Sequence, residues 1–421
     1  LTVPNVAMYT NAKTVGTNPL ENKGNITIGK NAIGIYGFEE TNTGNITVGN
    51  AGVGMYSQGG DVNLNAGKIK TGSEEAVGVY SVGKNQTITN SGTAFDLGEN
   101  SFGFVNSGEE NKVISTIANN KLKNHSVYIY SNDTTGRVEN STKLVANGDR
   151  NYGIYSAGTV KNTADIDFGA GIGNVGIYSM KGGTAFNSAK ITVGNSDIEN
   201  NLYGIGMAAG YKKEDKGSVE NLHDGEIIVK SENSIGMYAS GKDSIVTNRG
   251  TITLNANRTT GIFLDNGAKG YNYGTIKTGV ASLKNVVGVY VANGSILENH
   301  GSITIDAANA VGAYKKGGGI FKNYGTINIT GVEAQKEFEY KVADTSKGIE
   351  GLEIDIKSGS PIVKRNGVAV KPVEINVNPS GVPKTVEASG IGMYMDTSGI
   401  RFTKPIENLQ ALTDKADIIV G

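Results

Sequence analysis

Residues 294–314 read "GSILENHGSITIDAANAVGAY", and much of the chain repeats this segment. "DSIVTNRGTITLNANRTTGIF" (residues 243–263) has almost the same pattern, and "GGIFKNYGTINIT" (residues 318–330) repeats its first half. A first phrase, apolar-Gly-apolar-Tyr, recurs at residues 33–36, 53–56, 77–80, 152–155, 175–178, 235–238, 287–290, 311–314 and 391–394. A second phrase, Asn-x-Gly-(Thr/Ser/Asn)-Ile, recurs at residues 22–26, 42–46, 248–252, 272–276, 299–303 and 323–327. A repeat of about 24 residues is typical of a solenoid rather than of several globular domains.

Each repeat predicts three short β-strands. "GTITL" and "GSITI" alternate apolar with polar residues, which indicates half-buried strands rather than helices. An apolar pair such as Ile245-Val246 precedes the Asn-x-Gly turn, and the Tyr phrase supplies the third strand. In that turn we expect the glycine to adopt a positive φ and the asparagine to bond the local backbone. The chain is therefore predicted to be all-β, a right-handed parallel β-helix with three strands per rung.

The Tyr phrase also predicts which side chains face inward. In Val53-Gly54-Met55-Tyr56, strict alternation places the valine and the methionine on one face and the glycine and the tyrosine on the other. We expect the aliphatic pair to lie inside, because the third position is apolar in every copy. The tyrosines are then predicted to stack along one outer face, where their role is packing.

The repeat breaks near the C-terminal end. Residues 332–388 lack the Tyr phrase, and Asn366-Gly367 separates two alternating runs, which is typical of a two-residue β-hairpin. The neighbouring segments "LEIDI" and "VEINV" predict further strands. We expect rungs over residues 1–331, an inserted small antiparallel β-hairpin subdomain protruding from the rod over 332–388, and a last rung with a short helix over 389–421.

Composition excludes several classes of function. The 421 residues include 39 Lys and Arg against 40 Asp and Glu, so no basic block favours nucleic-acid binding. The chain has no cysteine, which excludes disulfides and thiolate metal sites. No run of 18 apolar residues predicts a membrane-spanning helix. The first residues do not resemble a signal peptide, so if the protein is exported we expect this chain to be a mature or excised piece.

No motif indicates a cofactor or a metal. "GIGNVG" (residues 171–176) matches a dinucleotide-binding glycine pattern, but its last glycine opens a predicted strand instead of a helix. His125, His223 and His300 do not have the spacing of zinc ligands. His300 occupies the middle of an Asn-x-Gly turn, where other rungs have arginine or tyrosine. That position is therefore expected to face solvent.

Two pairs of acids leave an enzymatic alternative open. Asp165 and Asp167 share one strand face, as do Glu353 and Asp355, and paired carboxylates can cleave glycosides. Alternation also places such residues on the outer face of any half-buried strand. We expect no catalytic residues. The binding candidates lie in a charged lengthened turn (residues 208–224) and in the predicted hairpin: Lys212, Lys213, Asp215, Lys364, Arg365 and Asn366.

The repeated phrases "NxGTITV" and "GVGMYS" resemble the passenger domains of large fusobacterial outer-membrane autotransporter adhesins of the monomeric type V secretion class. The tail "GIGMYMDTSGIRFTKPIENLQALTDKADIIVG" (residues 390–421) resembles the closing segment of such a passenger. The resemblance covers essentially the whole chain and implies a cell-surface location and a C-terminal β-barrel translocator beyond residue 421. It also implies host-cell or bacterial surface receptors, glycan or protein, as partners. No family motif transfers a binding residue to a position of this chain.

The sequence therefore predicts a non-enzymatic surface adhesin or stalk that mediates attachment to other bacteria or host cells. Two alternatives remain open. One is a β-helical polysaccharide-degrading enzyme, and the other is a pure spacer whose ligand sites lie upstream. No cofactor is expected.

Overall fold

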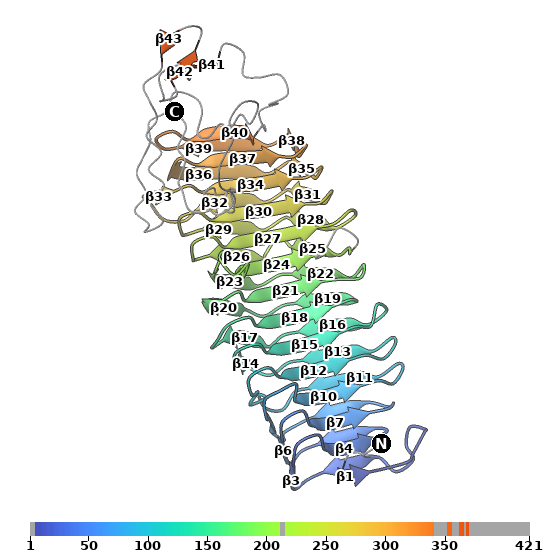
Figure 1. Ribbon diagram of the computed structural model, residues 1–421. Coiled ribbons are helices and arrows are strands. Elements are labelled where there is room, and N and C mark those ends of the chain that lie inside the picture. Colours follow the sequence, from blue (N-terminus) through green and yellow to red (C-terminus); the bar gives the residue numbers. More distant parts are fainter. Residues whose placement is uncertain (1–4, 211–214, 341–351, 356–361, 366–367, 370–421) are drawn as a thin grey trace. The chain divides into compact units, whose positions relative to one another are not determined.

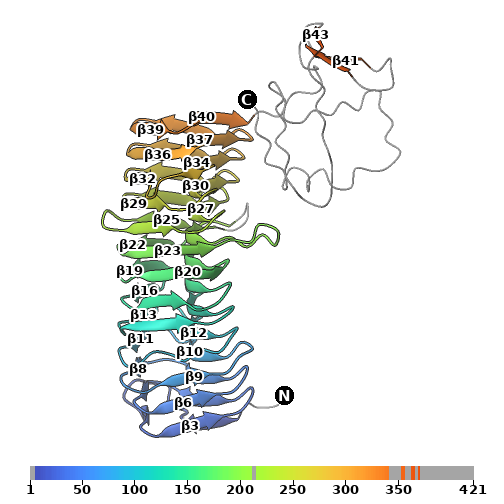
Figure 2. The ribbon, with the colours of Figure 1, turned by 90° about the vertical axis from the view of Figure 1, so that its left-hand side faces the viewer.

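The computed structural model describes residues 5–210, 215–340, 352–355, 362–365 and 368–369. All regular secondary structure among them is β-strand, in agreement with the predicted all-β class. The chain divides into two compact units, residues 1–340 and residues 341–421. The first unit is a parallel β-helix, as the repeat predicts, and its strands lie above one another along a rod (Figures 1 and 2).

Three long stacks of strands form the walls of this rod, and every pairing between rungs is parallel. Sheet 1 contains fourteen strands. Its strands are β1 (Val6–Tyr9), β4 (Ile33–Gly37), β7 (Val53–Ser57), β10 (Val77–Ser81), β12 (Phe102–Asn106), β15 (Val127–Ser131), β18 (Tyr152–Ser156), β21 (Val175–Ser179), β24 (Ile205–Ala209), β27 (Ile235–Ser240), β30 (Thr260–Asp265), β34 (Val287–Ala292), β37 (Val311–Lys316) and β40 (Gln335–Tyr340).

Sheet 2 follows sheet 1 in each rung. Its strands are β2 (Leu20–Asn22), β5 (Glu40–Asn42), β8 (Val62–Leu64), β11 (Thr87–Asn90), β13 (Lys112–Ser115), β16 (Arg137–Asn140), β19 (Thr159–Asn162), β22 (Thr184–Asn187), β25 (Ser218–Asn221), β28 (Ile245–Asn248), β31 (Lys269–Asn272), β35 (Ile296–Asn299) and β38 (Ile320–Asn323).

The third wall is interrupted between β9 and β14, where residues 95–97 take the place of a strand. Its first part is β3 (Asn25–Ile28), β6 (Asn45–Val48) and β9 (Ile69–Thr71). Its second part, sheet 3, is β14 (Asn119–Leu122), β17 (Lys143–Ala146), β20 (Ile166–Ile172), β23 (Lys190–Asn195), β26 (Glu226–Val229), β29 (Thr251–Leu254), β32 (Thr275–Thr278), β33 (Leu283–Lys284), β36 (Ser302–Ala308) and β39 (Thr326–Thr330).

Equivalent positions of the repeat pair directly with one another. In sheet 1, Tyr36 pairs with Tyr56, and Tyr56 pairs with Tyr80. In sheet 2, Asn221 pairs with Asn248 in the same way. Each position of the phrase therefore becomes a column of like side chains along the rod.

The third position of the Tyr phrase faces the core, as predicted. Ile35 and Met55 have no exposed surface, and one continuous apolar core runs through the rungs. The predicted place of the first position was wrong, because Val53 is only partly buried and lies outside this core. The residues at the first and fourth positions both face outward, so the phrase does not follow strict alternation.

The glycine of the Tyr phrase faces inward, which corrects the prediction that it lies under the tyrosines. A Cβ on Gly54 would lie 2.6 Å from the carbonyl oxygen of Gly78 and 3.3 Å from Ile69 Cγ2, a core side chain. In one rung the glycine position holds Tyr128, whose side chain is completely buried. Glycine is therefore used because neighbouring rungs and the core leave no room for a side chain.

A buried asparagine ladder joins the rungs at the end of sheet 2. Asn187 Nδ2 donates to Asn221 Oδ1 at 2.9 Å, and Asn221 Nδ2 donates to Asn248 Oδ1 at 3.0 Å. The same bonds link Asn22 to Asn42, Asn140 to Asn162, Asn162 to Asn187, Asn248 to Asn272, Asn272 to Asn299 and Asn299 to Asn323. Local bonds confirm the predicted backbone contact, since Asn42 Nδ2 donates to the Gly44 carbonyl at 2.9 Å.

The glycine after Asn-x has a different role from the one predicted. Gly250, Gly274 and Gly301 are not among the residues with positive φ. A Cβ on Gly274 would instead lie 2.0 Å from the carbonyl oxygen of Gly250 in the preceding rung. Close stacking of successive turns therefore requires glycine here, and asparagines such as Asn233 and Asn285 adopt positive φ in other turns.

The rod extends beyond its predicted end at residue 331. β40 pairs in parallel with β37, so Gln335–Tyr340 is a rung strand rather than part of the insertion. Its charged residues hid this role in the sequence. In the second unit, β41 (Leu352–Asp355) pairs antiparallel with β42 (Ile362–Arg365), which pairs antiparallel with β43 (Val368–Ala369). β41 lies in the predicted strand "LEIDI", whereas Asn366-Gly367, "VEINV" and residues 389–421 lie outside the described residues.

Candidate binding surfaces

A ladder of aromatic rings covers the outer face of sheet 1, as predicted. It consists of the fourth-position residues Tyr9, Tyr36, Tyr56, Tyr80, Tyr130, Tyr155, Tyr178, Tyr238, Phe263, Tyr290, Tyr314 and Phe338, with Val105 and Ala208 in two rungs. Tyr56 and Tyr80 stack with centroids 5.3 Å apart and planes at 7°, and Tyr290 and Tyr314 with centroids 4.7 Å apart. Neighbouring rings thus cover one another's faces. Partial burial raises the pKa of the Tyr56 and Tyr314 hydroxyls.

A second aromatic stack lies at the turns that follow sheet 2. We name Arg249, Tyr273, His300 and Tyr324 the turn stack, because each is the middle residue of an Asn-x-Gly turn. The Arg249 guanidinium lies 4.7 Å from the Tyr273 ring centroid. The ring of His300 lies between Tyr273 and Tyr324, at centroid distances of 5.0 and 4.9 Å, with interplanar angles of 14° and 20°.

The turn stack is exposed and bordered by charge. Tyr273 is 43% exposed and Tyr324 is 63% exposed. Arg249 Nε donates to Glu220 Oε1 at 2.6 Å. Glu298 accepts from Lys322 Nζ at 3.1 Å and lies 3.4 Å from His300 Nε2, and these two contacts, the lysine first, lower the pKa of its carboxyl.

The prediction that the middle residue of this turn faces solvent is confirmed, but the stack itself was missed. The signal was present in the sequence. Tyr273, His300 and Tyr324 occupy the same position in consecutive copies, and rungs in register must place them one above another. Tyrosine and arginine side chains are common at protein binding surfaces.

The predicted binding residues are only partly described. Asp215 Oδ1 accepts hydrogen bonds from the backbone N–H groups of Lys181 and Lys216, at 3.1 and 2.9 Å. Its carboxylate therefore holds the turn against the adjacent rung. Lys212, Lys213 and Asn366 lie outside the described residues. Lys364 and Arg365 belong to β42, where Lys364 pairs with Glu353 across the antiparallel ladder.

The paired acids do not gather into a larger cluster within the described residues. Asp165 accepts from the Lys190 N–H at 3.2 Å and forms an ion pair with the Lys190 side chain at 3.8 Å. Asp167 Oδ1 accepts from the Gly169 N–H at 3.3 Å. No group of three His, Cys, Asp or Glu side chains in the described part of the chain is arranged to hold a metal. Glu353 and Asp355 lie on β41.

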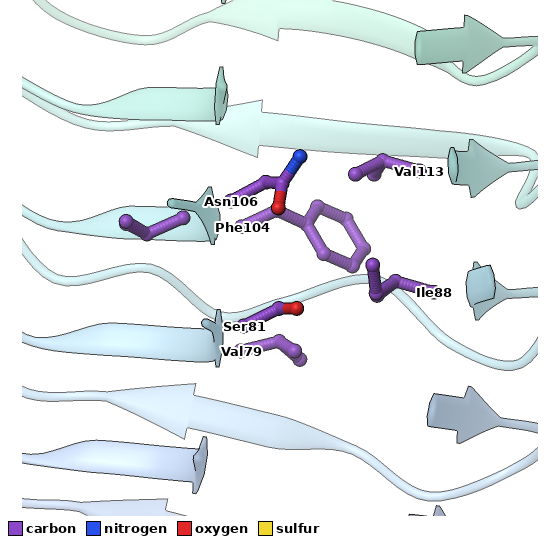
Figure 3. Close-up of a pocket in the computed structure, with 7 residues that line it drawn as sticks. Val79, Ser81, Ile88, Phe104, Asn106 and Val113 are labelled. Atoms are coloured by element: carbon purple, nitrogen blue, oxygen red, sulfur yellow. The ribbon is translucent and has the colours of Figure 1, made fainter. Parts of the chain in front are cut away.

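The interior of the rod is packed around these walls. One gap lies between Val79, Ile88, Phe104 and Val113 of the core and is bordered by Ser81, Val105 and Asn106, and it has no room for a water molecule (Figure 3). Nearby, Tyr128 Oη and Ser115 Oγ lie 2.6 Å apart. Burial raises the pKa of the Tyr128 hydroxyl to about 12. These buried polar groups join rungs and leave no room for a ligand at the gap.

Over the described ranges, no helix has the length and hydropathy needed to cross a membrane.

Comparison with known families agrees with the fold. Residues 169–275 match the family described as "BigA third pectate lyase-like domain". BigA is a bacterial surface autotransporter-like adhesin, and a pectate lyase-like domain is a β-helix. No curated protein and no solved structure matches the chain significantly. The matched segment runs from within β20 to the first residue of β32 and lies wholly within the rod. It points to a bacterial cell-surface protein of the adhesin type.

Proposed function

We propose that this chain is a non-enzymatic adhesive stalk, part of the passenger of an autotransporter, that attaches a bacterium to other bacteria or to host cells. The observation that supports it most strongly is the match of residues 169–275 to a domain of a surface adhesin, set within a rod of in-register rungs. The resemblance of the repeated phrases to fusobacterial passengers supports the autotransporter role. A C-terminal β-barrel would then hold the rod at the outer membrane.

The turn stack is the proposed adhesive surface within the described rod. Its rings are already stacked and its charges already paired, so binding would order few additional side chains. Tyrosine and arginine offer apolar area together with hydrogen-bond donors, which suits either a protein or a glycan receptor. The spacer alternative assigns no receptor contact to this surface.

Cell binding tests this proposal. The purified 421-residue chain is labelled and titrated onto partner bacteria and cultured host cells. Tyr273→Ser/Tyr324→Ser should reduce the bound fraction at least tenfold, because it removes the two most exposed rings of the turn stack. Tyr203→Ser is the matched control, since Tyr203 is 36% exposed but lies outside the stack. Wild-type binding that the double variant leaves unchanged would contradict the role of the turn stack.

The second unit needs a separate arm of the same experiment. Deletion of residues 341–388 removes the predicted hairpin but keeps β40, which belongs to the rod. A loss of binding in this arm alone would place the adhesive site in the hairpin. No binding by the intact chain would favour the spacer.

A further inference from the structure

The outer face of sheet 1 differs from the other two outer faces in one respect: from β4 to β37, its first- and fourth-position columns carry no charge. Two columns of side chains form it, the aromatic ladder and the first-position residues of the Tyr phrase. From β4 to β37 the first-position column contains Ile33, Val53, Val77, Phe102, Val127, Tyr152, Val175, Ile205, Ile235, Thr260, Val287 and Val311. Neither column contains a lysine, arginine, aspartate or glutamate over these strands.

Chance does not explain this pattern well. Charged residues make up 19% of the chain, and they concentrate on surfaces, so about five would be expected among these two dozen positions. The outer face of sheet 2 carries Lys112, Glu139 and Lys161 at paired positions, and that of sheet 3 carries Lys143 and Lys190. The rod therefore has two charged faces and one uncharged face.

This uncharged face is not covered by another described element. Figure 1 shows sheet 1 at the front of the rod, with no described strand in front of it. Most of the fourth-position rings, such as Tyr56 and Tyr290, remain partly exposed. In the first-position column Val53 and Val287 are partly exposed, whereas Val77 and its equivalents Ile33, Val127, Val175 and Ile235 are buried. Part of the face already forms its own small apolar cluster outside the core, built from Val175, Tyr178 and Ala208 with neighbouring rings. Apolar surface of this extent on a soluble rod marks an interaction surface.

We propose that this face pairs with the same face of a second copy of the chain, with the two rods side by side and pointing in the same direction. The two columns offer no ion pair to a charged partner, whereas a second copy presents an uncharged face of the same length and strand spacing. The twelve strands from β4 to β37 at about 4.8 Å, and a width of about 10 Å between columns, give about 600 Å² per copy. Two copies would bury about 1,200 Å², the lower end of stable interfaces.

The shapes of the two columns set the direction. The aromatic ladder is a ridge of large rings, and the first-position column beside it is lower because most of its side chains are Val or Ile. A two-fold axis parallel to the rod places the ridge of each copy over the low column of its partner. A two-fold axis across the rod would oppose ridge to ridge and leave gaps on both sides. The interface is therefore isologous, with parallel rods.

Sedimentation tests the pairing. The full chain is measured by analytical ultracentrifugation from about 1 to 100 µM, at low and high salt. We expect a dimer that persists in high salt, because apolar contacts are not screened. Val53→Lys/Val287→Lys should shift the dissociation constant at least a hundredfold. Ile245→Lys/Ile296→Lys is the matched control. Each isoleucine is the first residue of a sheet 2 strand, is partly buried and lies on the outer face of that sheet.

Three results would overturn the proposal: a wild-type monomer at every concentration, a dimer that survives Val53→Lys/Val287→Lys, or an equal loss of dimer in both double variants. Circular dichroism shows whether each variant is folded. If the lysine variants unfold, two single-cysteine variants test the same interface by thiol protection. Because the chain has no cysteine, Val53→Cys and Ile245→Cys each offer one thiol, and only the first should be protected from a maleimide when the dimer forms.

Orientation is tested by a spin label at Gln58→Cys, beside the aromatic ladder and near one end of sheet 1. Parallel rods place the two labels roughly 25 Å apart, whereas antiparallel rods separate them by more than about 40 Å. Pulsed dipolar spectroscopy distinguishes these distances. A long distance would contradict the fit of ridge and low column.

Discussion

Glu40 occupies a core position of sheet 2, where neighbouring rungs have Leu20 and Val62. Its side chain has no exposed surface, and neither carboxyl oxygen has a hydrogen-bond partner at normal geometry. Burial raises the pKa of this carboxyl from 4.5 to about 8, opposed only by the backbone of Gly37. Glu40 is therefore mostly protonated at pH 7 in the folded rod.

This shift makes the stability of the folded chain depend on pH. Between pH 4.5 and about 8 the unfolded chain loses the proton of Glu40 while the folded chain keeps it. The folded state is therefore favoured at low pH, and its stability falls as the pH rises through this window. The penalty is about 1 kcal/mol at pH 5, about 3 kcal/mol at pH 7 and about 5 kcal/mol at pH 8.5.

Urea unfolding of the full chain at pH 5 and pH 8.5 measures this penalty. Glu40→Val restores the aliphatic residue found at this position in the next rung. It should stabilise the chain at both pH values, and its advantage should grow by about 4 kcal/mol between them, because titration of all other groups cancels in the comparison. Glu40→Gln should show the same growth, and Glu21→Gln, an exposed neighbour, should show none. An advantage of Glu40→Val that does not change with pH would refute a neutral buried Glu40.

The other predictions concern the contacts between rungs, and each is measured by urea unfolding. Gly261→Ala should destabilise the chain by about 1 to 3 kcal/mol, since its Cβ would lie 2.5 Å from a backbone oxygen of the next rung. Gly29→Ala, with nothing within 4 Å, should have little effect. Asn187→Ala should cost about 2 to 4 kcal/mol, because it removes one buried hydrogen bond from each of the two neighbouring asparagines, Asn162 and Asn221. Tyr128→Phe should cost about 1 to 2 kcal/mol through the lost contact with Ser115.

Much of the rod could be predicted because repetition constrains it. Strands in register turn each recurring letter into a column, so the aromatic ladder followed from the position of tyrosine in the phrase. The antiparallel pairing of β42 with β43 followed from the turn preference of the dipeptide Asn366-Gly367. The asparagine ladder could have been predicted by the same argument, since an amide that recurs at one position in most rungs can bond its own copies; Leu64 and Ser115 take this position in two rungs.

Other features could not be predicted from local rules. Alternation allows the aliphatic pair of Val53-Gly54-Met55-Tyr56 to share a face, but the strand places glycine and methionine inward together. Tyr128 makes the inward direction of this position visible, because it replaces the glycine in one rung and its side chain is completely buried. The position of Glu40 depends on the register of a three-residue strand, which its sequence "ETN" does not specify.

The proposed function is attachment to a cell surface without cleavage of its polysaccharides. The most direct measurement incubates the 421-residue chain with partner cells and with their isolated surface polysaccharides, and follows bound protein and released sugar ends in the same samples. We expect saturable binding that Tyr273→Ser/Tyr324→Ser reduces, and no release of sugar ends above that of a sample without protein. Release that increases with time and protein concentration would contradict it and establish the enzymatic alternative.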